Sequence, residues 1–270
     1  MASPRQRAAR WRYVQYAVLV AVLLAIAFIA DWGQIQRAFW NWELVKEQFP
    51  DVITIALKNT IIYTACGFAF GLVLGLVLAL MRLSSVGPYR WIATGIIELF
   101  RGLPALVVFI ALSVGFNLAF PRYEIPFGNL GVVTLALGLV GGAYMAETIR
   151  AGIQAVPKGQ MEAARSLGMS HSRAMISVVV PQAFRIILPP LTNELILLTK
   201  DSSLAFLLGT TLDQQELAQF GRAALNEVRS LTPILVVGLC YLIITIPLSY
   251  LARRLERRFG SAGMPKGAEV

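Results

Sequence analysis

The sequence is short of charge, of histidine and of cysteine. Only 14% of its 270 residues are charged whereas 57% are hydrophobic, a composition too apolar for a soluble domain of this size. His171 is the only histidine, which argues against histidine-based metal sites and catalytic triads. Cys66 and Cys240 lie inside apolar runs without a CxxC partner, so we expect neither a disulfide framework nor a metal site.

Motifs of catalysis and of nucleotide binding are also missing. The sequence has no GxxxxGK[ST] loop for ATP, and no GxSxG, HExxH or paired-carboxylate pattern on an aqueous loop. A net charge of +9 could indicate nucleic-acid binding. The basic residues, however, cluster at the ends of apolar runs without interleaved aromatic residues, which is typical of membrane topology. We therefore predict neither an enzyme nor a nucleic-acid partner.

Long apolar runs are what the sequence has in abundance, and they predict an all-α integral membrane protein of about six transmembrane helices. The first run is just long enough to span a bilayer. A cleaved signal peptide is its alternative, but the apolar core is long and Asp31-Trp32 is not a convincing cleavage site. The spans are expected at about residues 13–30, 60–80, 91–120, 129–149, 190–209 and 233–251.

Glycine and proline positions predict how some of these helices pack and bend. Gly67, Gly71 and Gly75 recur every four residues, so they share one helix face and allow a second helix to approach closely. Pro104 should kink the third span. Pro190 suits the first turn of the fifth span.

The distribution of charge predicts the topology. Six spans place both termini on one side, together with the basic segments 82–90 and 157–181. The positive-inside rule makes that side cytoplasmic. We divide the chain into residues 1–58 (basic N-terminal tail, first helix and outer surface segment), 59–253 (transmembrane domain) and 254–270 (basic cytoplasmic C-terminal tail).

Several charges fall inside or beside the predicted spans. Glu194, Lys200 and Asp201 lie in the fifth span, where an ionised group needs a partner or a wet cavity. Lys200 and Asp201 are adjacent and cannot pair well within one helix, so they either line a transport path or pair with other helices. Three opposite-charge pairs stand three residues apart and can form within one turn: Glu98 and Arg101, Glu147 and Arg150, Glu162 and Arg165.

The segment between the fourth and fifth spans, QMEAARSLGMSHSRAMISVVVP (160–181), does not look membrane-embedded. Its composition predicts a helix over 158–167 that ends at Gly168, and a second helix capped by Ser170 and running towards Val180. A solvated connecting loop is the plain alternative.

The spacing in this segment resembles the EAA loop of ABC-importer permeases. That pattern is EAA, three residues, Gly, nine residues and Ile-x-Leu-Pro; here it reads Glu162-Ala163-Ala164, Gly168 and Val178-x-Val180-Pro181. The surrounding chain, over about residues 59–253, is similar to the polar-amino-acid (His/Glu/Gln/Arg) branch of these permeases. The similar stretches are ELFRGLP (98–104), YMAETIRAG (144–152), PQAFR (181–185) on to Asn193, and KDSSL (200–204).

The resemblance implies the permease subunit of an ATP-driven ABC importer for polar amino acids, with glutamate or glutamine as a first guess. Glu162, Ala163, Ala164 and Gly168 would couple this cytoplasmic loop to a separate ATPase, by docking a helix in a groove. The implied partners are two ATPase subunits (which would hold ATP and Mg, with no cofactor in this chain), a second permease subunit, an extracytoplasmic substrate-binding protein and a bacterial inner membrane. The weaker candidates for the substrate path are Arg101, Asn193, Lys200 and Asp201.

The main alternative is an ion-coupled secondary transporter or a channel that uses Lys200 and Asp201. Such folds often contain inverted repeats, and none is convincing here; this alternative also gives no reason for the EAA spacing. A membrane-embedded enzyme would need a catalytic constellation that the sequence lacks. The residues do not name the amino acid, so a basic amino acid or cystine remains open beside glutamate and glutamine.

Overall fold

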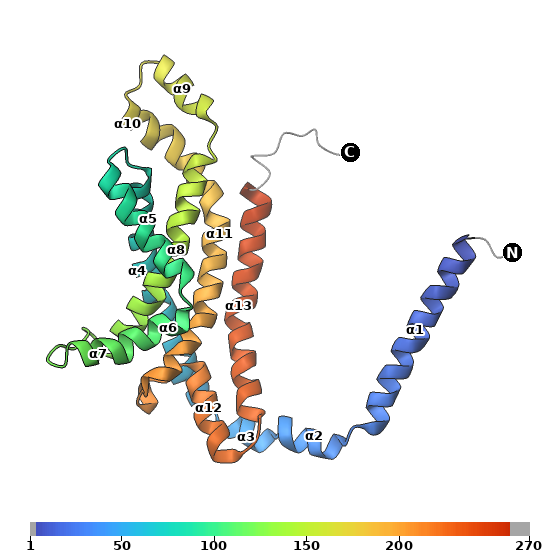
Figure 1. Ribbon diagram of the computed structural model, residues 1–270. Coiled ribbons are helices and arrows are strands. Elements are labelled where there is room, and N and C mark those ends of the chain that lie inside the picture. The colour runs from blue at the N-terminus through green and yellow to red at the C-terminus, as the bar shows by residue number, and fades with distance from the viewer. Residues whose placement is uncertain (1–3, 260–270) are drawn as a thin grey trace.

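The computed structural model describes residues 4–259, and over this range the chain consists of helices joined by loops, without strands (Figure 1). Five helical segments are long and apolar enough to cross a membrane, or six if one sharply bent helix pair counts as a span. This agrees with the predicted all-α membrane protein of about six spans. The long segments are α1 (Pro4–Ile29), η1 (Val52–Leu57) with α4 (Lys58–Leu83), α8 (Asn129–Gln154), α11 (Val180–Asp201) and α13 (Thr232–Phe259).

Shorter helices connect these spans and cover their ends. Short π-helical or 3₁₀ segments continue several of the long helices. The shorter elements are α2 (Trp32–Phe39), α3 (Trp42–Glu47), α5 (Gly87–Gly102), α6 (Ala105–Ile110), η2 (Ala111–Gly115), α7 (Phe116–Ala119), α9 (Lys158–Ser166), α10 (His171–Ala174), η3 (Met175–Val179), η4 (Ser202–Leu208), η5 (Leu212–Gln214) and α12 (Leu217–Val228).

Helices α4 and α8 form the most extensive contact in the bundle. Gly71 lies against the backbone of Gly138 and Gly142, and a Cβ atom added there would come within 3.2 Å of the Gly138 carbonyl oxygen. At Gly75 an added Cβ would lie 2.9 Å from the Gly142 oxygen. The predicted role of the glycine stripe in close helix packing is thus confirmed.

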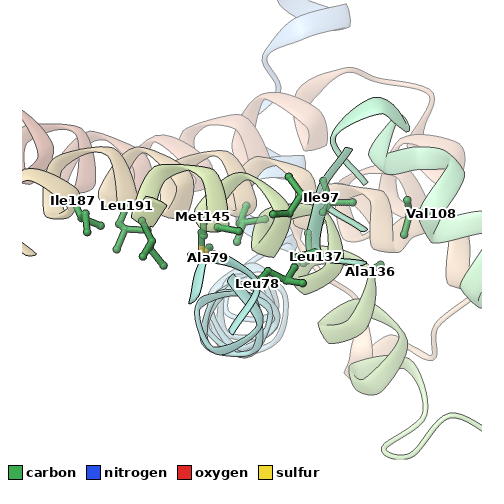
Figure 2. Close-up of a cluster of buried hydrophobic side chains, with 14 of the residues drawn as sticks. Leu78, Ala79, Ile97, Val108, Ala136, Leu137, Met145, Ile187 and Leu191 are labelled. Atoms are coloured by element: carbon green, nitrogen blue, oxygen red, sulfur yellow. The ribbon is translucent and has the colours of Figure 1, made fainter. Parts of the chain in front are cut away.

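The main core forms where three other helices pack against α8. Leu78 of α4, Ile97 of α5 and Ile187 of α11 belong to the same buried cluster as Leu137 and Met145 of α8, and Figure 2 shows Ile187 at the opposite side of that cluster from Leu137. A second, smaller core lies at one end of α13, where α3, η1 and α12 meet it. Cys240 is buried in this second core as a free cysteine.

The sequence predicted one helix kinked at Pro104 for the third span, but the structure has two separate helices there. Helix α5 ends at Gly102, α6 begins at Ala105, and the segments on either side are bent by 104°. Leu103 is extended because it precedes a proline, and Pro104 has no N–H with which to continue the α5 hydrogen bonds.

The fifth span begins earlier than predicted. Helix α11 starts at Val180 with a proline in its first turn, so Pro189 and Pro190 lie inside it. Membrane helices tolerate interior prolines because neighbouring groups can satisfy freed carbonyls. These two prolines leave the Arg185 and Ile186 carbonyls without their helical N–H donors. The span ends as expected at Gly209, whose φ is +62°.

Helix α1 stands apart from the bundle and reaches it through α2 (Figure 1). No residue between Trp11 and Ile29 is buried.

The second span begins at Val52 rather than near residue 60, because η1 runs directly into α4. The α9–α10 pair and the end of α13 lie at one end of the bundle, and α2 and α12 at the other (Figure 1). Residues 260–270 of the predicted C-terminal tail lie outside the described residues.

Candidate functional site

Helices α9 and α10 form a pair that projects from one end of the bundle (Figure 1). The turn between them is a Schellman motif: the Met169 N–H donates to the Ala164 carbonyl at 3.2 Å, and the Gly168 N–H to the Arg165 carbonyl at 3.0 Å. Gly168 has a φ of +85°, a conformation that side-chain-bearing residues rarely adopt. The predicted order of helix, glycine and helix is confirmed.

The second helix of the pair is the start of a much longer one. The Ser170 hydroxyl caps α10 by accepting from the Arg173 N–H at 3.4 Å, as predicted. Helices α10, η3 and α11 then run on without a break, and with η4 they form one segment from His171 to Leu208. The projecting turn is therefore continuous with a helical segment long and apolar enough to span a membrane.

The predicted coupling residues differ in exposure. Glu162 and Ala163 are exposed, whereas Ala164 is buried. Leu167, which the sequence reasoning missed, is 85% exposed at the tip. The predicted pair of Glu162 with Arg165 is wrong: the turn brings the Met169 carbonyl within 3.1 Å of the Arg165 guanidinium, which donates to it instead.

A second group of polar side chains joins α4, α5 and α8. Glu147 accepts from Arg150 on its own helix and from Arg82 of α4 at 2.5 Å. Glu98 lies 3.9 Å from Arg101 and 3.8 Å from Arg82. Two of the three pairs predicted within one helix turn, Glu98 with Arg101 and Glu147 with Arg150, are thus confirmed. The bridging role of Arg82 was missed, because it depends on knowing that α4 packs against α8.

Arg101 also contacts Tyr144. The tyrosine hydroxyl donates to the Arg101 carbonyl at 3.3 Å, and the guanidinium carbon lies 5.6 Å from the centre of the tyrosine ring. These contacts hold the end of α5, just before the 104° bend, against α8.

Within residues 4–259, no side-chain hydrogen bond or ion pair joins the other candidates for the substrate path to one another. Asn193 and Lys200 are exposed and Asp201 is half-buried. Among the residues that the structure describes, neither Lys200 nor Asp201 has an ion-pair partner. The structure does bring together the segments that follow two of these residues. Helix η4, which follows Asp201, packs against α6, which follows Arg101.

Glu216 is an unexpected buried acid at the opposite end of the bundle. The sequence analysis did not single it out, and it is 0% exposed. Its carboxylate caps α12 by accepting from the Ala218 and Gln219 N–H groups at 2.7 Å, and accepts from the Tyr241 hydroxyl at 2.9 Å. Burial raises the pKa of this carboxyl to about 7, and the hydrogen bonds offset part of that rise.

Nothing in residues 4–259 resembles a metal centre: the described part of the chain has no group of three or more His, Cys, Asp or Glu side chains that could hold an ion. The site is thus a projecting helix pair beside a set of charged groups on membrane helices.

Comparison with known proteins gives one consistent family. Residues 71–261 match the model of the binding-protein-dependent transport system inner membrane component family. The L-cystine transport system permease protein TcyB of Bacillus subtilis is 38% identical over 223 residues, which is 80% of this chain and 90% of that protein. The arginine transport system permease protein ArgU of Corynebacterium glutamicum is 34% identical over 271 residues, covering 96% of this chain and 82% of that protein.

A solved structure shows the same architecture. A crystal structure of an amino acid ABC transporter with histidines contains a chain that matches with a TM-score of 0.71 and 33% identity. The match covers 81% of this chain and 98% of that chain. The chain therefore belongs to the inner-membrane components of binding-protein-dependent transport systems, the permease subunits of ABC importers.

Proposed function

We propose that this chain is the permease subunit of an ATP-driven importer of amino acids in a bacterial cell membrane. The α9–α10 pair would dock on a separate ATPase subunit that binds ATP and Mg. The observation that carries this proposal is the join between the projecting turn and α11, through one uninterrupted helical segment. Movement of the docked turn would tilt a membrane helix.

The surface of the helix pair suits helix-in-groove docking. Glu162, Ala163 and Leu167 are exposed, so the pair offers an acid, a small residue and an apolar anchor. The buried Ala164 and the Schellman turn at Gly168 fix the shape of the pair instead of forming its surface. The four coupling residues thus divide into two roles.

The proposed orientation places the α9–α10 end in the cytoplasm. The basic residues at the end of α13 lie at that same end of the bundle, as the positive-inside rule requires. A substrate-binding protein would then approach the opposite end, where α2 and α12 lie. Residues 59–253 would form the permease domain.

A second permease subunit, either another copy or a homologue, would complete the path. Arg101, Asn193 and Lys200 are exposed on the isolated chain, although they belong to membrane helices. Charged and amide groups are costly in hydrocarbon, so this face requires water or protein beside it. With Asp201, these residues remain our candidates for contact with the substrate.

Similar proteins are named for cystine and arginine, and others for glutamine and for glutamate/aspartate. We therefore assign amino acids as a class, with glutamate or glutamine as the working choice.

An ion-coupled secondary transporter, the alternative drawn from the sequence, is disfavoured by membership of the ABC-importer permease family. The observation in its favour is that Lys200 and Asp201 lack an ion pair within the described part of the chain. Uptake that survives ATP depletion but collapses with the ion gradient would select this candidate.

The deciding experiment is a pull-down of the tagged protein from its native host, with the co-purifying chains identified. We expect a P-loop ATPase in stoichiometric amount. Gly168→Pro removes the N–H that closes the turn and cannot adopt the positive φ, so it should abolish co-purification and uptake. Gly159→Ala is the matched control, because Gly159 lies in α9 with open space around it.

A separate variant tests the surface without altering the turn. Ala163→Trp adds bulk to an exposed position and should block docking, while the protein still inserts and remains folded. Ala164 is less suitable, since a bulky residue there would disturb the packing of the helix pair itself. A preparation that contains no ATPase, or full uptake by both Gly168→Pro and Ala163→Trp, would contradict the proposal.

A further inference from the structure

A row of polar side chains follows one face of α5 along most of its length. Its members are spaced four, four and three residues apart, so they lie one above another on the helix. A second row on α8 faces it. The rows are Arg90, Thr94, Glu98 and Arg101 on α5, and Tyr144, Glu147, Arg150 and Gln154 on α8.

Contacts between helices join the two rows into one surface, which we name the α5–α8 polar face. Arg82 of α4 lies within ion-pair distance of both Glu98 and Glu147. At the other end Tyr144 contacts Arg101. The polar face therefore continues from the first turns of α5 to the bend after Gly102.

Exposure shows that this face is not directed at lipid. The side chain of Glu98 is 58% exposed and that of Arg101 is 35% exposed. An ion pair on a membrane helix cannot leave that much of its surface in hydrocarbon without a large free-energy cost. Water in a transport path, or a second subunit, must lie against it.

The charge on the face is predominantly positive. Four arginines, at positions 82, 90, 101 and 150, stand against the two acids Glu98 and Glu147. Glu147 is shared between Arg82 and Arg150. Among the described residues, Arg90 has no carboxylate within ion-pair distance. An anion would balance the excess positive charge of this face.

An open surface depression of about 470 Å³, called the cavity below, lies where these charges gather. It is lined by Arg82, Arg90, Trp91, Thr94, Arg150 and Gln154. Guanidinium groups bind carboxylates through two parallel hydrogen bonds, and the hydroxyl and amide groups add further hydrogen-bonding capacity.

We propose that the α5–α8 polar face lines the cytoplasmic half of the transport path, and that this arginine-lined cavity binds the α-carboxylate of the amino acid on its way out. The inference rests on the proposed function. It assigns the cavity to the group that all amino acids share, so the side chain is selected elsewhere. Binding of a lipid phosphate is the competing use of the same anion chemistry.

Direct binding can be measured with Trp91 as the reporter, because it lines the cavity. The full chain, with its other four tryptophans replaced by Phe, would be placed in phosphatidylcholine nanodiscs and titrated with sodium acetate at constant ionic strength. We expect a saturable change in Trp91 fluorescence. Arg90→Gln should weaken acetate binding about tenfold, since a charge-assisted hydrogen bond is lost. Arg90→Lys should restore part of it.

Controls separate the site from general charge and from lipid. Arg122→Gln makes the same charge change in the exposed loop at residues 121–127 and should leave acetate binding unchanged. A Trp91 response to phosphatidylglycerol in the nanodisc, with none to acetate, would overturn the proposal in favour of a lipid phosphate. Identical titrations for the original chain and Arg90→Gln would also overturn it.

Uptake by whole cells distinguishes this inference from the proposed function. Arg90→Gln should raise the KM or lower the maximal rate several-fold, while the ATPase still co-purifies. If the ATPase co-purifies and Arg90→Gln cells transport normally, the cavity has another role and the importer stands. If no ATPase co-purifies but Trp91 reports acetate binding, the importer fails while the anion site remains.

Discussion

Helices α1 and α4 have the same length, 26 residues, and both are apolar enough to span a membrane, yet they differ completely in their surroundings. No residue of α1 between Trp11 and Ile29 is buried. Helix α4, by contrast, lies in the most extensive contact of the bundle, and its three stripe glycines are buried against α8. Hydrophobicity alone therefore identifies which segments enter the membrane, but not which of them pack together.

The sequence difference between the two helices lies in glycine. Helix α1 has none, whereas α4 has Gly67, Gly71 and Gly75 on one face. Apolar side chains gain little by leaving lipid for another helix, so association in a membrane depends on close backbone approach and van der Waals contact. The glycine face supplies that approach and α1 offers no equivalent.

The largest effect should come from filling the seam between α4 and α8. In Gly75→Leu the new side chain would start from a Cβ 2.9 Å from both the Gly142 oxygen and the Met145 Cβ, so the helices must separate. We expect a loss of about 3 kcal/mol or more, seen as a lower unfolding temperature of the purified protein. Ala21→Leu on the exposed α1 is the matched control and should have almost no effect. Equal shifts for both variants would show that close approach does not hold the pair together.

A smaller loss is expected from the charged contact between the same two helices. Arg82→Gln leaves Glu147 with Arg150 alone and should cost about 1–2 kcal/mol, a value reduced because both side chains are partly exposed. Adding Glu147→Gln should recover part of that loss, as a double-mutant cycle on unfolding temperatures would show. Additive losses would mean that Arg82 and Glu147 are not coupled.

Much of this packed region could be predicted from the sequence, because its signals are local. The glycine stripe and the pairing of Glu98 with Arg101 depend only on helical periodicity, and both are present. The turn at Gly168 follows from a helix, a glycine and a capping serine in that order, and it is also confirmed.

The features that were missed depend on contacts between distant segments. Arg82 reaches Glu147 only because α4 and α8 are neighbours. Pro190 lies inside a helix because α11 starts ten residues earlier, at Val180, whereas local rules place a proline at the first turn of a helix. The Glu216 carboxylate can be buried because it accepts hydrogen bonds from Tyr241, 25 residues away, and from the N–H groups of the first turn of its own helix.

Glu216 provides a pH-dependent test at the other end of the packed region. The native pKa of about 7 lies above the ordinary value, so the folded state holds the proton more tightly than the unfolded state does. The stability that this proton contributes is complete in acid and is lost as the pH rises through about 7. We expect the unfolding temperature of the native protein to fall relative to that of Glu216→Gln between about pH 5 and about pH 8. Parallel curves would show that the carboxyl does not titrate in this range.

The smallest effect should follow removal of α1. Deleting residues 2–30 removes a helix without buried side chains between Trp11 and Ile29, so the remaining bundle should unfold within a few degrees of the full chain. The contacts that fix α3 on α13, such as the Asn41 N–H donating to the Thr232 hydroxyl at 3.0 Å, remain in the shortened chain. Unfolding should be measured on purified protein, so that any loss of membrane insertion appears as lower yield and not as lower stability. A drop comparable to that of Gly75→Leu would show that α1 packs against the bundle after all, and that a long apolar helix without glycine can still hold a membrane domain together.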